Sequence, residues 1–409
     1  MTSPLVTVVT PSYNQGRFIR ATIESVLSQD YPAIEYIIMD GGSTDETASI
    51  ASEYASRLTW ISEKDRGQTH AINKGFRQAK GTIVGWMNSD DIALPGAVSC
   101  AVAAFEQRPE LGAVYGEGYT IDIDGNVTGR FTPTERFNLW KLVYVWDYVL
   151  QQTVYFRKSV LEEIGYLDES LHWSMDWDVL IRIGMRYPLG YLPEHMGALR
   201  EYVETKTASG GGPRFRELVR LMRRHGGRRY PPGYFIYGVD TYERILWTSV
   251  QRWTPAFLRW LTTRAQGRMT SVSRRWIDRM VANTQGWFPD GWAAPRVEYL
   301  LPRGTKAVRV RGSVPDMQAA LNGQSLRVTC NGQAIGEVAL PVGDFAVTFG
   351  LPAEASLSCA NIVLDASRWL VPKALGTSPD SRRLAYVLHE VNEIGEAYNG
   401  SHPPGQERD

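Results

Sequence analysis

The chain has 409 residues, more than a typical single domain, and 43% of them are apolar, so we expect two or three domains with cores of their own. Its formal net charge of zero points to no particular partner, and no apolar run approaches the roughly 20 residues that span a bilayer. The three scattered cysteines lack metal spacing and no signal peptide precedes the first strand, so we expect a cytoplasmic protein with reduced cysteines.

Four strand–helix units are predicted in the first 90 residues. Apolar, β-branched runs at residues 5–10, 35–39, 58–62 and 81–87 are typical of buried strands, and stretches with helical spacing separate them. This order predicts a twisted parallel sheet with right-handed crossovers. The strands end in Tyr13 and Asn14, in Asp40, in Asp65, and in Asp90 with Asp91. Because the carboxyl ends of parallel strands meet at one edge, these side chains predict a ligand site there.

The fourth strand runs directly into Asn88, Ser89, Asp90 and Asp91. Adjacent carboxylates suit a hard divalent cation that keeps some waters and bridges to phosphate oxygens. Alternatively, Asp90 caps the next helix and Asp91 is solvated. On this stretch alone, both interpretations stand.

Five segments together resemble the family 2 glycosyltransferases, in that family's order and approximate spacing. They are Val8–Asn14, Asp40–Asp45, Ser62–Gln68, Ala71–Phe76 and Asn88–Asp91. The resemblance implies the GT-A fold, a nucleotide-binding α/β domain that transfers sugars from nucleotide donors with inversion. It also implies Mn²⁺ or Mg²⁺ as cofactor and favours UDP over GDP or dTDP.

The resemblance implies a set of nucleotide-binding positions. The backbone around Thr10 and Pro11, with Tyr13, resembles the wall that stacks on uracil, and Asp40 matches the carboxylate that holds the base. The predicted nucleotide-binding residues are Thr10, Pro11, Tyr13, Asp40, Ser43, Asp65, Gly67, Asn73, Lys74, Ser89 and Asp90.

Asp90 and Asp91 match the last two positions of the family's metal-binding DXD motif, whose first position is Asn88 here. We predict Asp91 as the direct metal ligand, with Asp90 as a second ligand or a ribose partner. Many relatives carry His near the position of Tyr202, and His195 does not replace it in sequence, so a third ligand is unassigned. Arg200 and Lys206 are predicted to contact the diphosphate.

The resemblance also implies a catalytic base at Asp176, where Met175 replaces the usual preceding Glu. An inverting transfer needs a carboxylate that accepts the proton of the acceptor hydroxyl. Alternatively, Asp176 is an acid that interacts with the dipole of its helix, and Asp178 with Arg182 is predicted to be a structural pair. The residues expected on the acceptor side are Gln152, His172, Trp173 and Trp177, the last as an apolar platform for a sugar.

Composition divides the chain into a transferase domain (1–212), an Arg/Trp-rich helical region (213–285), a β-sandwich (286–395) and a disordered tail (396–409).

The helical region is strongly basic: from Arg214 to Arg279 there are 15 Arg, no Lys and four acids, so its net charge is 15 − 4 = +11. Within 245–280, Trp253, Phe257, Trp260 and Leu261 share a helical face. These residues either contact an anionic membrane or pack on the catalytic domain, and we favour packing. No nucleic-acid motif accompanies the charge.

The β-region resembles accessory domains of some polysaccharide-building transferases. Its hairpin signals are Asn322-Gly323 and Asn331-Gly332. Trp287, Trp292 and Trp369 either stack on sugars or, as we favour, belong to the core.

We therefore expect an inverting, metal-dependent glycosyltransferase of bacterial type. It would move a sugar from a nucleotide donor to a glycan or polyprenyl-diphosphate-linked acceptor for surface polysaccharide, at the inner face of the plasma membrane. The alternatives are an inactive glycan-binding protein on a transferase scaffold, or another nucleotide-sugar-using α/β enzyme.

Overall fold

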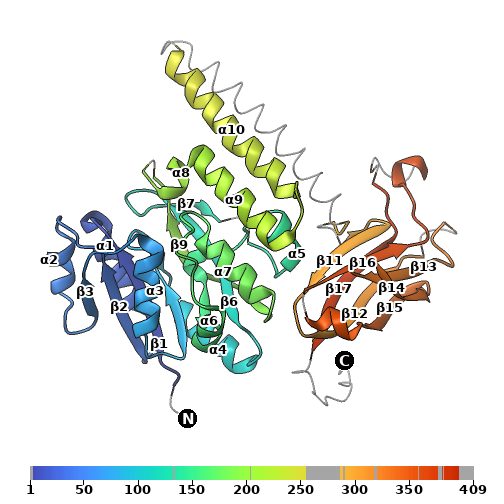
Figure 1. Ribbon diagram of the computed structural model, residues 1–409, viewed down its shortest axis with the longest axis horizontal. Helices are drawn as coiled ribbons and strands as arrows, with labels where there is room; N and C mark the ends of the chain where they lie inside the picture. The colour runs from blue at the N-terminus through green and yellow to red at the C-terminus, as the bar shows by residue number, and fades with distance from the viewer. Residues whose placement is uncertain are drawn as a thin grey trace. The chain divides into compact units, whose positions relative to one another are not determined.

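The computed structural model describes residues 3–131, 134–202, 204–254, 286–288, 291–316, 320–357, 359–375, 380 and 382–395. The chain divides into two compact units, Met1–Arg268 and Met269–Asp409, each with its own sheets (Figure 1). None of the helices in the described ranges is long and apolar enough to cross a membrane.

The first unit is built on a nine-stranded mixed sheet in the order β3-β2-β1-β4-β8-β6-β9-β5, with β7 paired to β6. The first four strands along the chain, β1 to β4, are parallel, as predicted, whereas β8 is antiparallel to β4. The strands are β1 (Val6–Ser12), β2 (Ile34–Asp40), β3 (Thr59–Ser62), β4 (Ile83–Trp86), β5 (Ile92–Ala93), β6 (Ala113–Ile121), β7 (Val127–Arg130), β8 (Tyr155–Arg157) and β9 (Leu189–Arg200).

Helices cover both faces of the parallel strands, which is why those strands are apolar on both sides. α1 (Gly16–Leu27) and α4 (Ala97–Gln107) share a buried cluster with one face of β1 and β2. α3 (Gln68–Gln78) packs on the opposite face, where a Cβ at Gly75 would lie 2.4 Å from Val9. Only glycine allows α3 to approach the sheet this closely at that point.

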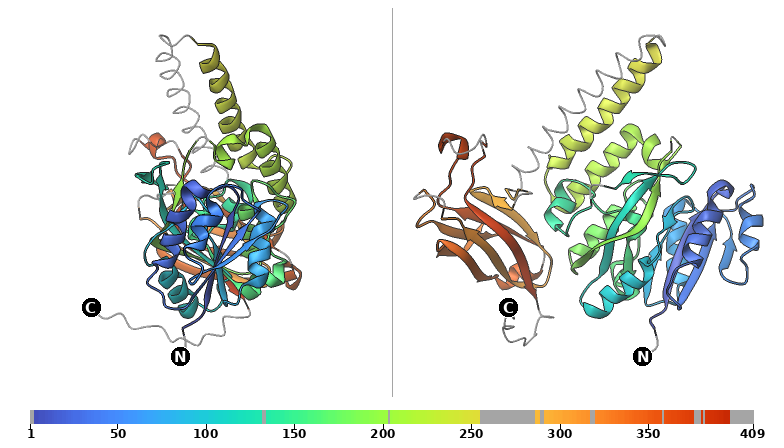
Figure 2. Two further views of the ribbon diagram at one scale, coloured as in Figure 1. Left: turned by 90° about the vertical axis from the view of Figure 1, so that its left-hand side faces the viewer. Right: turned by 180° about the vertical axis from the view of Figure 1, so that it is seen from behind.

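Seven helices and one 3₁₀ turn complete the described part of this unit: α2 (Thr47–Ser52), α5 (Leu139–Tyr144), η1 (Gln151–Thr153), α6 (Lys158–Ile164), α7 (Met175–Gly184), α8 (Lys206–Ser209), α9 (Gly211–Gly226) and α10 (Pro232–Trp253). β8 begins only at Tyr155, because the backbone before it forms a 3₁₀ turn, in which the N–H of Thr153 donates to the carbonyl of Leu150 at 3.0 Å and that of Val154 to Gln151 at 3.0 Å. α9 packs on α5 and α10, so the described part of the Arg-rich region belongs to this unit, and both views of Figure 2 show α10 beside α9 and continuing past it.

The buried carboxylate of Asp178 joins α7 to α9. It accepts a hydrogen bond from Nε of Arg182 at 2.6 Å. It also lies 2.8 Å from Nε2 of His225, which belongs to α9. Burial alone would raise the pKa of Asp178, but the bonds from His225 and Arg182 leave the pKa lower than usual. The predicted structural pair is therefore present, with His225 as an added partner.

We expect Asp178→Asn to lower the free energy of unfolding by about 3 kcal/mol, because it leaves Arg182 without its buried counterion. Since the folded pKa is depressed, the contribution of Asp178 is complete above its unfolded pKa of about 3.9 and disappears as the pH falls through the folded pKa. Denaturant titrations at pH 7 and near pH 3 check this. Glu53→Gln, which breaks the exposed Arg20–Glu53 pair, is the control and should change stability far less. Equal losses in both variants would contradict the prediction.

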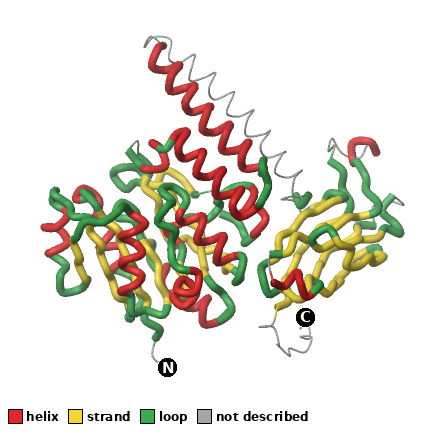
Figure 3. The backbone as a smooth tube through the Cα atoms, viewed as in Figure 1, coloured by secondary structure: helices red, strands yellow, loops and turns green. Residues whose placement is uncertain are grey.

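The second unit is a β-sandwich of two four-stranded antiparallel sheets, β10-β17-β12-β15 and β11-β16-β13-β14, whose inner faces share one buried core. Figure 3 shows it as mostly strand, in yellow. Its elements are β10 (Trp292–Ala293), β11 (Arg296–Leu301), β12 (Thr305–Val314), β13 (Ser325–Cys330), β14 (Gln333–Ala339), β15 (Gly343–Gly350), β16 (Ala360–Ala366), β17 (Tyr386–Gly395), η3 (Ala353–Leu357) and η4 (Pro372–Leu375).

The tryptophans of the second unit differ in exposure. Trp287 and Trp292 pack against the core, as favoured from the sequence. Trp369 is 46% exposed, and the guanidinium of Arg383 lies 5.6 Å from its ring centre. The predictions for Phe257, Trp260, Leu261 and the tail lie outside the described residues.

Candidate functional site

The side chains of Tyr13 and Asp65 lie against the Gly41 backbone where β1, β2 and β3 end, and we call this place the Tyr13–Asp65 slot. A Cβ at Gly41 would lie 2.8 Å from Oδ2 of Asp65 and 3.3 Å from Cδ2 of Tyr13, so the backbone of Gly41 lies directly against both side chains. The Tyr13 ring is 61% exposed, and an exposed aromatic ring beside a carboxylate can stack on a base whose polar edge meets Asp65. Gly67, at φ 113°, donates its N–H to Asp65 at 2.7 Å and sets that carboxylate in place.

Asp40 is a buried carboxylate that organises the neighbouring loops. Its Oδ2 accepts from the N–H groups of Gly42 (3.1 Å) and Ser43 (2.9 Å) and from the Ser62 hydroxyl (2.6 Å). Ser43 also donates its hydroxyl to Asp40 and accepts the N–H of Asn14 at 2.8 Å. Asp40 therefore fixes the walls of the slot, and its own oxygens are largely used by the protein.

Asp90 and Asp91 have different surroundings. Asp91 is 2% exposed, and its carboxylate accepts from Asn88 Nδ2 (2.9 Å), Gln152 Nε2 (2.6 Å) and the Arg200 N–H (2.9 Å). Asp90 is half-buried and accepts the Tyr202 hydroxyl at 2.8 Å. Asp91 thus ties β9 and η1 to the end of β4, whereas Asp90 has one side-chain donor and the more open position.

These surroundings also shift the acidities. Burial and the neighbouring Asp90 charge raise the pKa of Asp91 to about 7, against the bonds from Gln152 and Arg200. Burial raises the pKa of Asp90 as well. Two acids forced together in a partly dry site gain from a divalent cation between them and a phosphate ligand.

The donor set fits such a cation. Among the described residues no three His, Cys, Asp or Glu side chains form a preformed metal cluster. Mg²⁺ and Mn²⁺ sites of phosphate-using proteins need fewer, because one or two carboxylates suffice when substrate phosphates and waters complete the shell. Tyr202 stands at the position where the resemblance implies His, and its hydroxyl donates to Asp90. His195 lies elsewhere, stacked on Tyr119 at 4.5 Å.

Arg200 and Lys206, the two residues predicted to contact the diphosphate, have different surroundings. Arg200 is 4% exposed and donates to the carbonyls of Asp90 (2.7 Å), Asp122 (2.9 Å) and Ile123 (3.1 Å). Its guanidinium therefore holds the backbone of Asp90 to that of residues 122–123, in contrast to the predicted diphosphate contact. Burial lowers the pKa of Lys206, while Asp176 opposes this shift.

Lys206 is connected to the end of β4 by side-chain amides. Its Nζ donates to Gln68 Oε1 at 3.0 Å, and Gln68 Nε2 donates to Asn88 Oδ1 at 2.8 Å. Asn88 in turn donates to Asp91. Lys206 therefore lies between Asp176 and the sheet edge that carries Asp90 and Asp91. At that place its ammonium group could contact a diphosphate.

Asp176 lies in the first turn of α7, where the helix dipole favours a carboxylate. Its Oδ1 accepts the N–H of Trp177 at 2.8 Å, and burial raises the pKa of Asp176. Asp147 is its acidic neighbour, and burial together with the Asp176 charge raises the pKa of Asp147 well above the usual value. Arg214 lies close enough to lower both values. Asp147 could not be identified from the sequence, because it stands in an apolar stretch outside the recognised motifs.

Glu217 of α9 holds the segment that leads into α7. Its carboxylate accepts the N–H groups of His172 (3.0 Å), Trp173 (2.7 Å) and Ser174 (2.9 Å), and the Ser174 hydroxyl at 2.9 Å. Three consecutive N–H groups are thereby satisfied by one buried anion. Glu217 was not predicted, although it is the single acid among the arginines at 214–229.

Glu217→Ala is expected to leave three N–H groups unsatisfied and to loosen this segment, so donor turnover should fall about tenfold or more while nucleotide binding stays near wild type. Glu217→Gln, which keeps one acceptor oxygen, should lose less. Turnover and nucleotide-induced thermal shifts of both variants test this. A fall in nucleotide binding as large as the fall in turnover would contradict a role confined to the acceptor side.

Of the other residues predicted on the acceptor side, Trp177 is buried in the core, whereas His172 and Trp173 are more accessible. Trp177 is 1% exposed, donates to the carbonyl of Leu142 at 2.6 Å and packs on Tyr237, so its ring lies in the core, in contrast to the predicted sugar platform. His172 is exposed and stacks edge-on against half-buried Trp173, whose Nε1 donates to the Lys206 carbonyl at 3.2 Å. These two rings remain available beside Asp176.

The other residues predicted to bind the nucleotide bond to, or are buried in, the protein around the site. Thr10 bonds to the Tyr36 hydroxyl in the core, and Asn73 ties α3 to the backbone of Leu167. Lys74 pairs with Glu63 at 2.8 Å. Pro11 and Ser89 are buried at the ends of β1 and β4.

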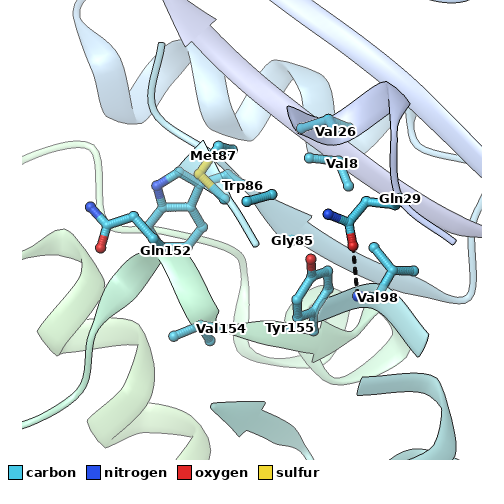
Figure 4. A pocket seen from close by; sticks show the side chains of 11 residues that line it. Val8, Val26, Gln29, Gly85, Trp86, Met87, Val98, Gln152, Val154 and Tyr155 are labelled. Carbon is cyan, nitrogen blue, oxygen red and sulfur yellow. Dashed lines mark hydrogen bonds between the residues drawn. The ribbon is translucent and has the colours of Figure 1, made fainter. Parts of the chain in front are cut away.

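A cavity of about 10 Å³ lies beneath the site, between β4, β8 and the helices α1 and α4 (Figure 4). It is lined mostly by apolar side chains, and Gln29 at its edge bonds to the backbone of Val98. Its volume is at most that of one water, so it is a packing void and not a ligand site.

Comparison with known proteins agrees with this geometry. Residues 7–165 match the model of glycosyl transferase family 2. The segment belongs to this family. The match covers the ends of β1 to β4, where Tyr13, Asp40, Asp65 and Asp90 lie, and it confirms the resemblance stated from the sequence. The predicted fold class, an α/β transferase domain followed by helices and a β-sandwich, is confirmed as well.

Relatives of the family 2 segment include an uncharacterized glycosyltransferase of Rickettsia prowazekii, 28% identical over 183 residues, which are 43% of this chain and 58% of that protein. Chondroitin synthase of Escherichia coli is 37% identical over 127 residues, or 30% of this chain and 18% of that protein. The chain thus covers less than two thirds of either relative. A solved mannosyltransferase of Pyrobaculum calidifontis in complex with GDP-Man and Mn²⁺ aligns with a TM-score of 0.46 at 22% identity, over 69% of this chain and 85% of that one.

Proposed function

We propose that the chain is an inverting glycosyltransferase that uses a divalent cation and a nucleoside-diphosphate sugar, with UDP the expected nucleotide. The observation that carries the proposal is the meeting of the Tyr13–Asp65 slot, the Asp90 carboxylate and Lys206 along one sheet edge, with Asp176 beside it. The family match of residues 7–165 supports it.

In this proposal the base stacks on Tyr13 and its polar edge meets Asp65, while Asp40 keeps the loops in place. Asp90 would hold Mn²⁺ or Mg²⁺ together with the donor diphosphate. We prefer Asp90 to Asp91 because Asp91 already accepts three hydrogen bonds. When bound, the cation would offset the charge that develops on the departing diphosphate. Lys206 would add a second positive charge at the same place.

The acceptor side is proposed to be the surroundings of Asp176. As a carboxylate, Asp176 would accept the proton of the attacking hydroxyl while the sugar leaves the diphosphate. His172 and Trp173 would offer ring faces to a glycan, and Gln152 would act indirectly, by holding Asp91. A glycan or lipid-linked glycan for a bacterial surface polysaccharide is the acceptor class we expect.

The test is thermal stabilisation of the full-length protein by UDP, GDP and dTDP, each with Mn²⁺ and with EDTA. A nucleotide that raises the melting temperature only with Mn²⁺ would support the Asp90 site and identify the donor class. If none of the nucleotides shifts the melting temperature, the transferase proposal fails. A glycan-binding protein on a transferase scaffold would then be the better account, and a panel of oligosaccharides would replace the nucleotides.

A further inference from the structure

The exposed face of α10 carries an apolar stripe. Phe235, Tyr242, Leu246 and Trp253 are 43%, 58%, 49% and 83% exposed. Their spacings of seven, four and seven residues place them on one side of the helix. At 1.5 Å per residue the stripe is roughly 27 Å long. Such a row of exposed apolar side chains is uncommon on a soluble monomer and marks an interaction site, and the Tyr242 ring, which lies 5.7 Å from that of Phe215, joins the row to α9.

Arginines join this stripe at its N-terminal end. The ring of Tyr230, 53% exposed, lies 5.5 Å from that of Tyr234, which lies 5.2 Å from that of Phe235. The guanidinium of Arg223 is 5.8 Å from the rings of Tyr230 and Tyr234, and that of Arg229 is 5.3 Å from Tyr230. We call this surface the aromatic–arginine face; it comprises Arg223, Arg229, Tyr230, Phe235, Tyr242, Leu246 and Trp253.

The charge of the surrounding elements is strongly positive. Residues 211–254 hold nine Arg, no Lys and three acids, so 9 − 3 = +6. Of the acids, Glu217 is buried against residues 172–174, and Asp240 pairs with Arg244 at 3.2 Å. Little of the negative charge therefore offsets the exposed Arg216, Arg220, Arg223 and Arg229.

We propose that the aromatic–arginine face binds the surface of an anionic phospholipid membrane. Tyr, Trp and Leu side chains would enter the headgroup region while the arginines contact lipid phosphates. A second copy of the chain fits less well, because a two-fold interface would place this positively charged region, +6 over residues 211–254, against a second copy of itself. Of the membrane-contact segment predicted at 245–280, the structure describes residues 245–254, and Trp253 there is exposed and not packed on the domain.

The same helix reaches the acceptor side of the site. Tyr237 lies two residues beyond Phe235, packs on Trp177 at 5.6 Å and accepts the N–H of Asp147 at 3.2 Å. A membrane on the outer face of α10 would thus lie near Asp176, which suits a lipid-linked acceptor. This last point rests on the proposed function, but membrane binding itself does not.

The experiment is co-sedimentation of the full-length protein with vesicles of phosphatidylcholine alone and of phosphatidylcholine with phosphatidylglycerol, at low and at physiological salt. We expect binding to the anionic vesicles only, weakened by salt. Arg223→Gln with Arg229→Gln should weaken it about fivefold per arginine. Phe235→Ser with Leu246→Ser should weaken it about tenfold or more. The matched control is Val127→Ser, since Val127 on β7 is 62% exposed and distant in sequence from the face.

Absence of binding to anionic vesicles would overturn the proposal, as would binding that the arginine and apolar substitutions leave unchanged. So would a dimer, seen by light scattering, that these substitutions dissociate while vesicle binding stays the same. Melting temperatures of all variants must match wild type for a loss of binding to count; if the paired apolar variant fails to fold, Trp253→Ser replaces it. The assay contains no nucleotide, so its result is independent of whether the transferase proposal holds.

Discussion

Asp176→Asn is expected to lower sugar transfer at least about 100-fold, because an amide cannot accept the proton that the acceptor hydroxyl loses. Nucleotide binding should stay near wild type, since the base slot at Tyr13 and Asp65 and the Asp90 carboxylate are built by other elements. The measurement is release of nucleoside diphosphate from the nucleotide sugar that stabilises the protein, with extracted bacterial glycan and lipid as acceptor. Thermal shift with the same nucleotide measures binding in parallel.

The matched control is the same substitution in the neighbouring carboxyl group, Asp147→Asn. Burial and the negative charge of Asp176 raise the pKa of Asp147 well above its usual value, so the charge of Asp176 favours the neutral form of Asp147. Asp147 is therefore expected to be the neutral partner, and an amide there should keep most of the activity. If Asp147→Asn abolished transfer while Asp176→Asn kept it, the roles of the two acids would be reversed.

The pH dependence follows from the same geometry. The base must be ionised to accept a proton, and burial raises the pKa of Asp176. The fraction of active enzyme therefore rises with pH through that raised pKa, so the acid limb of the rate profile should lie above the value of about 3.9 of an ordinary Asp. A rate that is independent of pH from 4 to 7 would contradict the assignment of a buried base.

The sheet and its ligand edge could be predicted from the sequence because they depend on local patterns. The β-branched runs before Tyr13, Asp40 and Asp90 each specify a strand, and chain order then brings their ends together. The hairpin at residues 113–130 and the strands of the sandwich follow from the same alternation and turn residues.

Contacts over long sequence separations could not be predicted. Glu217 bonds to residues 43 to 45 positions before it, and Asp91 bonds to Arg200, 109 positions later. Neither pairing has a local sequence pattern. Trp177 and Arg200 were expected at the ligand because tryptophan and arginine often serve there, but tertiary packing buries both. The residue type shows what a side chain can bind, whereas its orientation depends on the tertiary packing.

Asp90 and Asp91 should separate in function when each is replaced by Asn. Asp91→Asn puts an amide N–H against the donors Asn88 Nδ2, Gln152 Nε2 or the Arg200 N–H, so the free energy of unfolding should fall by about 2–4 kcal/mol. Asp90→Asn loses only the bond from Tyr202 and should be close to wild type in stability. It should, however, lose the Mn²⁺-dependent part of nucleotide stabilisation. Denaturant titration and thermal shift against Mn²⁺ concentration measure the two effects. Were Asp91→Asn to remove the Mn²⁺ effect at unchanged stability, Asp91 would be the direct ligand, as first predicted from the sequence, and the three hydrogen bonds to its carboxylate would have to yield to the cation.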